Sequence, residues 1–459
     1  MRLITGALGR SFSRSPGLIL IFGYAVLIAM GTVFLSLPLA AVNGKLSFID
    51  ALFTASSAVC VTGLTIVDVS VTFTFFGKVI ILGLIQIGGV GIMVVSTIIL
   101  FSIGKKINIA GRMLIRDTYS FGEGQGIFSL VKDILLFTMV IELIGAILMF
   151  FRFYSQYPID RAIFYSVFHS VSAFCNAGFS LFSDSFVRYQ NDWVINLTIC
   201  ALIILGGIGF IVLSEIKNNF SFSRRAWSFL SLHTKLVLFS TFILLAISTA
   251  LILLLEWHNT LSGKPVTYKM LGAFFQAVNA RTAGFNTVQI GDLTNETLFL
   301  TVMLMFIGTA PGSCGGGIKI TTFSSMIILG FSKLSGQEYP QIFHRKISDV
   351  SIAKAVSLIM ISFLVITIGI ILLQQTEIGD VSHRLSRGKF LELMFETVSA
   401  FGTVGLSTGV TSSLTMAGKL VITIMMFIGR LGPLAIAMAV SRKKASKNYY
   451  YAQENIMIG

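Results

Sequence analysis

Four short stretches of the chain have a composition that suits the binding of a monovalent cation by backbone carbonyl groups. Each begins with Phe, continues through small and hydroxylated residues, and ends in a small residue, Gly, Leu or Phe, and a polar residue. The stretches are Phe53–Thr65, Phe168–Ser180, Phe275–Asn286 and Phe395–Ser407. Because Gly adopts backbone angles that other residues avoid, the carbonyl oxygens around it can turn toward one point. Rings of such carbonyls replace the water shell of an alkali cation.

The glycines of these stretches recur at near-constant spacing. Gly63, Gly178, Gly284 and Gly405 are separated by 115, 106 and 121 residues. Spacing of this kind predicts an internal repeat of four units. The alternative is that the stretches are ordinary loops whose glycines end helices. Helix caps alone do not explain the shared upstream Phe, so we favour the repeat.

The composition predicts a membrane protein. The 459 residues are 54% hydrophobic and 12% charged, whereas a soluble domain carries about 25% charged residues. The 40 Phe and 43 Gly residues are typical of packed membrane helices, which small residues allow to approach closely. The four cysteines have no CxxC spacing, which argues against a zinc site or a disulfide scaffold.

Long apolar runs flank each stretch in pairs, and each run can cross a hydrocarbon core of about 30 Å. The runs cover about 16–37 and 75–103, 134–153 and 193–214, 236–255 and 298–329, and 352–373 and 419–440. We therefore predict four units of helix, re-entrant pore segment and helix, at 16–104, 131–216, 234–332 and 351–441. The predicted fold is an all-α membrane protein with eight transmembrane helices and four re-entrant pore helices around a central pore.

The distribution of positive charge predicts the orientation. The N-terminus, the three links between units and the C-terminal tail hold 20 Lys and Arg residues, against 11 in the links on the opposite side. The positive-inside rule then places both termini in the cytoplasm, in a multi-pass protein of the cytoplasmic membrane. The net charge of +14 would suggest nucleic acid in a soluble protein, but here we expect no nucleic-acid partner.

The last helix of the third unit contains residues that helices tolerate poorly. Between Gly308 and Lys319 lie Pro311 and four glycines, Gly312, Gly315, Gly316 and Gly317, and both residue types disfavour a helix interior. This pattern predicts a helix that breaks within the membrane and leaves a flexible loop. A simple kink is the alternative, although four glycines are more than a kink requires.

Arg430 is expected near the middle of the membrane. It lies about 12 residues into its helix, or roughly 18 Å at 1.5 Å per residue. A charge at that depth costs at least about 2.5–3.5 kcal/mol and marks a functional candidate. A packing role, in which Arg430 pairs with a loop carbonyl, is compatible with this interpretation. For other polar residues we expect structural roles: Glu142 and Glu256 pair or cap, and His169 is hydrogen-bonded.

The four stretches resemble the selectivity filters of the Trk/Ktr/HKT superfamily of potassium transporters, over about residues 16–440. Only one apolar span precedes the first stretch, which resembles the membrane subunit of a bacterial Ktr system. The resemblance identifies the segment Gly308–Lys319, with Arg430, as an intramembrane gate. It also implies a filter formed by Val61, Thr62, Gly63, Asn176, Ala177, Gly178, Thr282, Ala283, Gly284, Thr403, Val404 and Gly405.

The resemblance implies potassium uptake through a channel-like pore, with sodium dependence left open. It also implies a homodimer, contact with lipid and a cytoplasmic, nucleotide-binding regulatory ring. The basic links between units offer contact surfaces for that ring or for anionic lipid. K⁺ is the expected ion, Na⁺ is open, and we expect no organic cofactor.

The sequence leaves two alternative functions. The filters keep only one Gly of the TVGYG pattern of potassium channels, so a less selective Na⁺/K⁺ channel or symporter is the first. An intramembrane enzyme is the second. It would need paired acids or a Ser/His dyad at helical spacing, which we do not find, so we predict no enzyme.

Overall fold

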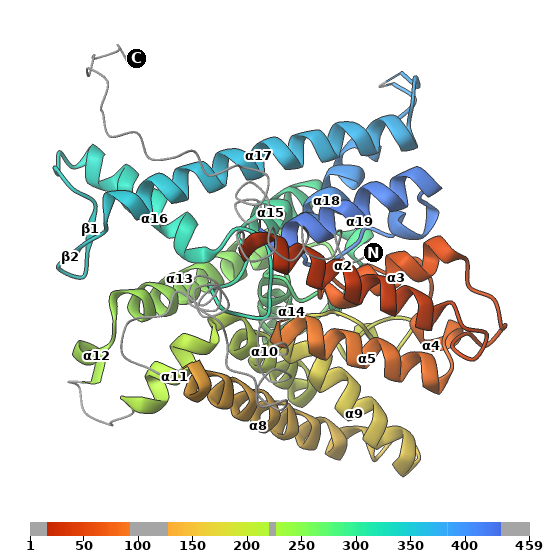
Figure 1. The fold of residues 1–459 in the computed structure, drawn as a ribbon. Coiled ribbons are helices and arrows are strands. Elements are labelled where there is room, and N and C mark those ends of the chain that lie inside the picture. Colours follow the sequence, from red (N-terminus) through yellow and green to blue (C-terminus); the bar gives the residue numbers. More distant parts are fainter. Residues whose placement is uncertain (1–15, 92–126, 220–225, 383, 433–459) are drawn as a thin grey trace, which may run out of the picture.

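The computed structural model describes residues 16–91, 127–219, 226–382 and 384–432 (Figure 1). These residues form mostly helices, with three 3₁₀ turns and one antiparallel hairpin. The α-helices are α2 (Pro16–Leu35), α3 (Phe48–Val59), α4 (Val69–Thr72), α5 (Phe75–Val90), α8 (Ile127–Phe153), α9 (Ile159–Phe174), α10 (Trp193–Ile208), α11 (Phe210–Asn218), α12 (Ala226–Phe229), α13 (Leu232–Leu255), α14 (Val266–Asn279), α15 (Asn295–Phe306), α16 (Ile320–Leu334), α17 (Asp349–Glu377), α18 (Lys389–Gly402) and α19 (Met416–Leu431). The remaining elements are η1 (Val187–Tyr189), η2 (Ile290–Asp292), η3 (Val410–Ser413), β1 (Gln341–Ile342) and β2 (Arg345–Lys346).

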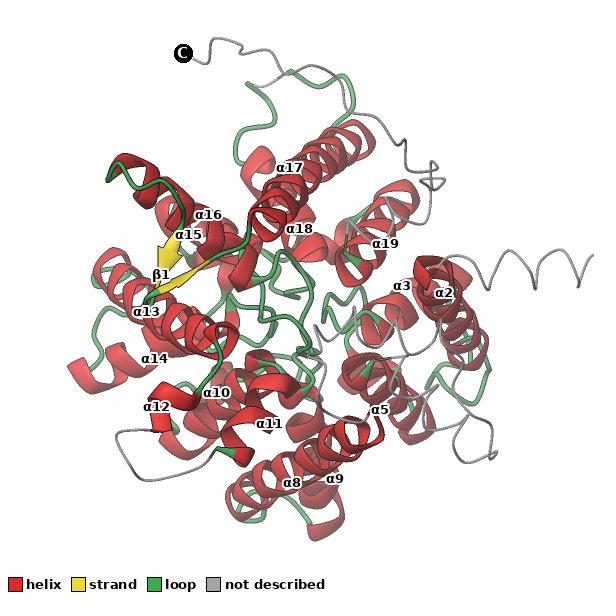
Figure 2. Cartoon of the chain, turned by 60° about the vertical axis from the view of Figure 1, so that its left-hand side comes forward, coloured by secondary structure: helices red, strands yellow, loops and turns green. Residues whose placement is uncertain are grey.

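The helices follow one another in four groups around a middle that is filled by loops, as Figure 2 shows. The groups are α2, α3 and α5; α8, α9 and α10; α13, α14 and α15; and α17, α18 and α19. In each group the middle helix ends just before one of the four glycines. The third helix of each group starts at a side-chain cap, in which Thr74, Asp192, Thr294 or Thr415 accepts a hydrogen bond from a first-turn N–H. Such caps satisfy donors that the helix itself leaves free.

Contacts between the groups close into a ring. The third helix of each group packs against the middle helix of the next: α5 on α9, α10 on α14, and α15 on α18. The last junction, between α19 and α3, joins the fourth group to the first. At this junction Lys419 donates to Asp50 across 2.9 Å.

The Phe that opens each stretch is part of the core. Phe53, Phe168, Phe275 and Phe395 are all fully buried. Each Phe side chain lies on a middle helix and packs between the helix groups. It therefore fixes the position of the glycine that follows. This burial supplies a physical reason for the recurrence of Phe in the sequence.

Three described helices are long and apolar enough to cross a membrane by themselves: Val131–Phe153 within α8, α13 and α17. The pair α10 and α11 would be a fourth span if it is counted as one, although its members meet at 92°. The expectation of a continuous helix over 193–214 is therefore wrong. Gly209 breaks it with a φ of +99°, which a residue with a Cβ rarely adopts. The total of eight spans stays a prediction, since parts of the first and fourth units lie outside the described residues.

A carboxylate at the end of α13 holds the start of α15. Glu256 is almost completely buried, and its Oε1 accepts hydrogen bonds from the N–H of Thr294 at 3.0 Å and its hydroxyl at 3.1 Å. Its Oε2 accepts from Asn259 and from the Thr260 hydroxyl, each at 2.8 Å. Burial favours the neutral acid, but these hydrogen bonds outweigh it and hold the pKa of Glu256 below its usual value. The expectation that Glu256 caps is confirmed.

We expect Glu256→Gln to lower the stability of the protein, because the amide nitrogen that replaces one oxygen cannot accept these bonds. Loss of hydrogen bonds to a charged group costs about 1.5–3 kcal/mol. Since the folded-state pKa is lowered, the carboxylate stabilises fully above the unfolded pKa of about 4.3, and its contribution disappears as the pH falls through the folded value. Thermal unfolding in detergent across pH checks this. Glu296→Gln, which removes an exposed carboxylate of the first turn of α15, is the matched control. Equal midpoints for the two variants at neutral pH would contradict the capping role.

Candidate functional site

The four glycine segments, which are residues 61–63, 176–178, 282–284 and 403–405, share one unusual backbone conformation. In each, the residue two positions before the glycine is left-handed: Val61 has a φ of +56°, Asn176 +58°, Thr282 +65° and Thr403 +50°. The glycines also have positive φ, between +69° and +91°. A left-handed non-glycine residue costs about 1–3 kcal/mol and persists only where its surroundings impose it. The sequence predicts such angles for glycine, whereas the structure also places the residue two positions earlier in the left-handed region.

The four glycines form a closed ring in which each approaches a carbonyl group of the next segment. A Cβ built on Gly63 would lie 2.5 Å from the carbonyl oxygen of Ala177, and one on Gly178 would lie 2.6 Å from that of Ala283. A Cβ on Gly284 would meet the carbonyl oxygen of Val404 at 2.7 Å, and one on Gly405 would meet that of Thr62 at 2.0 Å. The carbonyl oxygens of Thr62, Ala177, Ala283 and Val404 therefore alternate with the glycines around one point. No side chain fits there.

Hydrogen bonds from the middle helices hold the segments in this conformation. The Ser57 and Ser399 hydroxyls accept from the N–H groups of Gly63 and Gly405 at 3.0 and 3.1 Å. In the third group Asn279 accepts instead, from the N–H of Phe285 at 3.0 Å. Because these donors are engaged on the outer side, the carbonyl oxygens of the ring remain available as ligands.

A cavity of about 370 Å³ lies directly over the ring, and we call it the vestibule. All four glycines line it, together with the residues that follow them. Among the described residues, its lining includes the acidic Asp68 and Asp184 but no Lys or Arg. A space of this charge favours the approach of a cation.

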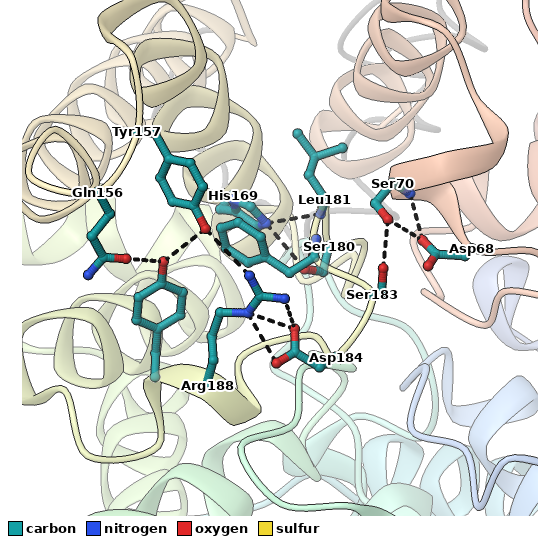
Figure 3. A network of polar contacts seen from close by, with 12 residues as sticks. Asp68, Ser70, Gln156, Tyr157, His169, Ser180, Leu181, Ser183, Asp184 and Arg188 are labelled. Atoms are coloured by element: carbon teal, nitrogen blue, oxygen red, sulfur yellow. Dashed lines mark hydrogen bonds and ion pairs between the residues drawn. The ribbon is translucent and has the colours of Figure 1, made fainter. Parts of the chain in front are cut away.

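Hydrogen bonds fix the acidic residues of the vestibule, as Figure 3 shows. Asp68 accepts from the N–H and hydroxyl of Ser70 at 2.8 and 2.6 Å, and that hydroxyl lies 2.9 Å from the hydroxyl of Ser183. Asp184 pairs with Arg188 at 2.6 Å. Burial favours the neutral acids, but these hydrogen bonds outweigh it and keep the pKa of both carboxyls below the usual value. Both are therefore charged at neutral pH.

Two polar side chains of the middle helices brace the vestibule wall. Nε2 of the buried His169 accepts from the N–H of Leu181 at 3.1 Å (Figure 3). Its Nδ1 lies 2.7 Å from the carbonyl oxygen of Tyr165. The expected structural role of His169 is confirmed. Glu396 holds the equivalent sequence position in the fourth group. It accepts hydrogen bonds from the N–H of Thr408 at 3.2 Å and from the hydroxyl of Thr411 at 2.8 Å. Sequence reasoning missed Glu396, although its position nine residues before Gly405, equivalent to that of His169 before Gly178, was a usable signal.

The segment between α15 and α16, residues 307–319, is a loop that folds back on itself. Its two ends meet, because the N–H of Gly308 donates to the carbonyl of Ile318 at 2.7 Å. The loop turns at Pro311, Gly312 and Gly317. Gly312 has a φ of +67° and Gly317 a φ of +68°. The Lys319 ammonium group donates to the carbonyl of Gly315 at 2.7 Å, which ties the last residue of the loop to its middle.

The loop lies against the ring on the side opposite the vestibule. The vestibule is lined by the glycines and by residues after them, whereas the loop contacts residues before them. The N–H of Gly316 donates to the hydroxyl of Thr403 at 2.9 Å. A Cβ on Gly315 would lie 2.3 Å from the hydroxyl oxygen of Thr282, so only glycine fits beneath that segment.

Arg430 holds the loop to two other helix groups. Its Nη1 donates to the carbonyl of Cys314 in the loop, and its Nη2 donates to the carbonyl of Gly88 on α5. Its Nε donates to the hydroxyl of Tyr24 on α2 at 3.3 Å. The guanidinium thus satisfies carbonyls that belong to the first and third groups while its own helix, α19, belongs to the fourth.

The third helix of each other group also ends at a glycine, which sequence reasoning missed. Gly91, Gly209 and Gly432 each follow a third helix with φ between +80° and +99° and ψ near +136° to +139°. Each stands three residues after a glycine whose Cβ would collide with the end of its own middle helix, as at Gly88, where the carbonyl oxygen of Val59 would be 2.1 Å away. The repeated spacing of these glycine pairs was visible in the sequence.

These features define a membrane protein that transports cations. Residues 26–450 match the TrkH family of cation transport proteins, and the chain belongs to that family.

Three of the proteins to which the chain is similar illustrate the relationship. It is 41% identical to the Ktr system potassium uptake protein B of Bacillus subtilis (strain 168), over 97% of each chain. It is 35% identical to the potassium/sodium uptake protein NtpJ of Enterococcus hirae, again over 97% of each. Its fold matches the crystal structure of the potassium transporter TrkH from Vibrio parahaemolyticus with a TM-score of 0.73, at 19% identity, over 93% of this chain and 84% of that one.

Proposed function

We propose that this protein takes up potassium across the membrane through the point at which the four glycine segments meet. The observation that carries the proposal is the closed ring of carbonyl groups and glycines beneath an acidic vestibule. Rings of carbonyl oxygens replace the hydration shell of an alkali cation. The names of the similar Ktr proteins and of NtpJ, which refer to potassium uptake, support the same conclusion.

The filter in this proposal consists of the four glycine segments, and their carbonyl oxygens bind K⁺. The gate consists of the loop between α15 and α16 with Arg430. The loop lies directly behind the ring, and the guanidinium adds a positive charge there, so together they oppose the passage of a cation. A rearrangement of the loop would remove both obstacles.

The proposed architecture has four units of helix, pore helix and helix, at 16–104, 131–216, 234–332 and 351–441, in a multi-pass protein with both termini in the cytoplasm. The cyclic contacts of α5, α10, α15 and α19 with the next middle helix support it. The relatives' names refer to a Ktr system, which implies a further component. We propose that this component is a cytoplasmic nucleotide-binding ring and that the membrane subunit is a homodimer. The basic residues 105, 106, 112, 116, 224 and 225 of the links lie outside the described residues.

A flux measurement tests the proposed function. The purified protein in proteoliposomes should take up rubidium, and potassium should compete with this uptake much more strongly than sodium does. The name of NtpJ, which refers to both ions, supports a less selective Na⁺/K⁺ pathway as the second candidate. Equal competition by the two ions would favour that candidate, and a stimulation by sodium would indicate sodium coupling. An absence of rubidium uptake by folded protein with its Ktr partner would contradict both.

We expect Asp184→Asn to weaken the capture of potassium, because the change removes one negative charge and leaves Arg188 unpaired at the rim of the vestibule. The KM for potassium should rise at low ionic strength, and the difference should shrink at high ionic strength, where exposed charges are screened beyond about 8–10 Å. The double variant Asp184→Asn, Arg188→Gln restores the balance of charge and serves as the control. A rise in KM that is insensitive to salt would show that the loop conformation had changed instead.

A further inference from the structure

A second cavity, of about 550 Å³, lies between α13 and α16, and we call it the lateral groove. Its walls are mostly apolar, and several of its residues, such as Ile247 and Phe331, are exposed at the outer surface. Along α13 the lining runs from Leu236 to Leu251, which is roughly 22 Å at 1.5 Å per residue. One leaflet of a bilayer has a hydrocarbon thickness of roughly 15 Å, half of the usual 30 Å. The groove is therefore long enough for an acyl chain.

One end of the lateral groove is lined by polar residues and has a basic residue beside it. Gln337, Gln341 and Ile342 line that end, and Ile342 pairs with Arg345 across the hairpin of β1 and β2. Residues directly opposite in an antiparallel pair share a face, so Arg345 lies on the face that Ile342 presents to the groove. The Arg345 side chain is exposed and makes no hydrogen bond or ion pair with any residue that the structure describes. Lys346, by contrast, lies over the ring of Tyr339 at 3.5 Å.

Aromatic residues place the hairpin at the level of lipid head groups. The ring of Phe343, between the two strands, lies 6.2 Å from Trp227 and 5.5 Å from Phe239. Trp and Tyr gather where the hydrocarbon core meets the polar head groups, and Trp227 and Tyr339 both lie at the hairpin. A basic residue at the same level would meet a phosphate rather than an acyl chain.

We propose that the lateral groove binds one anionic phospholipid, with an acyl chain between α13 and α16 and its head group on Arg345, Gln337 and Gln341. The apolar walls match the chain, and the free guanidinium matches the phosphate in charge and in its capacity for paired hydrogen bonds. Basic pockets between membrane helices bind anionic head groups in this way.

The occupant of the groove would also touch both ends of the loop that the proposed function assigns to the gate. Ile307 is the first residue of the loop and Ile320 follows its last, and both line the groove. Ile307 forms a bridge with Ile318, so a chain packed here holds α15 and α16 in their present arrangement. This regulatory step depends on the proposed function, whereas lipid binding itself does not.

Binding is tested with phosphatidylglycerol that carries a photoreactive group in its acyl chain, added to the full-length protein in phosphatidylcholine vesicles. We expect the label on peptides of α13 and α16. Arg345→Glu should weaken labelling at least about fivefold, the change that corresponds to about 1 kcal/mol for one basic group near an anionic surface. Lys354→Glu, at an exposed position in the first turns of α17, makes the same change of charge away from the groove and should leave labelling intact.

A second pair of variants separates the groove from any lipid-facing surface. Ile327→Trp fills the lateral groove and should abolish its labelling. Ile424→Trp makes the same change in a separate groove of about 390 Å³ between α2 and α19 and should leave α13 and α16 labelled. Unchanged labelling in Arg345→Glu or in Ile327→Trp would overturn the proposal. Cross-links from the groove to a second copy of the chain, or to the regulatory ring, would overturn it as well.

Transport supplies a separate readout. We expect phosphatidylglycerol to lower the basal rubidium flux of the unmodified protein but not that of Arg345→Glu. If phosphatidylglycerol changes the flux of both proteins equally, while only the unmodified protein is strongly labelled, the regulatory step is rejected and the lipid site stands. A failure of rubidium transport under all conditions would count against the proposed function instead.

Discussion

Gly284→Ser should weaken the preference of the protein for potassium, and Gly405→Ser should weaken it further. The new Cβ would lie 2.7 Å from the carbonyl oxygen of Val404 in the first variant and 2.0 Å from that of Thr62 in the second. Real side chains do not approach carbonyl oxygens this closely, so the ring must widen or lose a ligand. We expect the preference for potassium over sodium to fall at least about tenfold, which corresponds to about 1.4 kcal/mol.

The matched control for this prediction lies four residues after Gly405. Gly409 also has a positive φ, +103°, and it lines the same vestibule, but no atom lies within 4 Å of a Cβ built on it. Gly409→Ser therefore introduces backbone strain without crowding the ring. Competition of potassium and sodium for rubidium uptake in proteoliposomes gives the preference. If Gly284→Ser and Gly409→Ser behave alike, crowding of the ring is not what sets selectivity, and the assignment of the filter is wrong.

Removal of residues 312–317, or Arg430→Ala, should raise the flux of potassium and loosen its dependence on a regulatory partner. The deletion is compatible with folding, because Gly308 and Ile318 at the two ends of the loop are already hydrogen-bonded. Arg430→Ala removes the guanidinium that joins the carbonyls of Cys314 and Gly88. Loss of a hydrogen bond from a charged donor costs about 1.5–3 kcal/mol, so we expect the flux to rise about tenfold or more.

Two milder variants grade the effect. Arg430→Lys keeps the charge but loses the planar group that reaches two carbonyls at once, so its flux should be intermediate. Tyr24→Phe removes a single hydrogen bond, that from the Nε of Arg430, and should raise the flux least. The flux of all four variants, including the loop deletion and Arg430→Ala, is measured as potassium efflux from proteoliposomes at matched protein density. If the deletion variant is folded and its flux is unchanged or abolished, the loop is a brace and the gate lies elsewhere.

Much of this arrangement could be predicted from residue types and spacing. Phe and Gly recur because each pore segment requires one buried anchor and one position without a Cβ. Both requirements determine the residue type, so they are visible in the sequence. The break after Phe306 is visible for the same reason, because Pro311 and the glycines around it exclude a helix. Arg430 stands out because a cation deep within an apolar stretch of helix requires partners.

Other features could not be predicted because they contradict local preference. Val61, Thr282 and Thr403 are left-handed although their branched side chains disfavour that conformation. Only the ring of neighbouring segments imposes it, and no single stretch contains that information. The break at Gly209 was missed for another reason, since glycine is also common inside continuous membrane helices. The order of the groups around the centre depends on contacts between helices far apart in the chain.

The junction of α19 with α3 has a consequence for how the protein is made. Asp50 and Lys419 are 369 residues apart in the chain, and Arg430 reaches Gly88 across 342. While the ribosome is still synthesising the fourth group, the carbonyl of Gly88 lacks this donor, and the ring has an open side. The first three groups must therefore wait in the membrane, with polar backbone exposed to lipid or water, until the last helix arrives. Truncation before α19 should leave an insertion intermediate that membrane proteases recognise, rather than a smaller transporter.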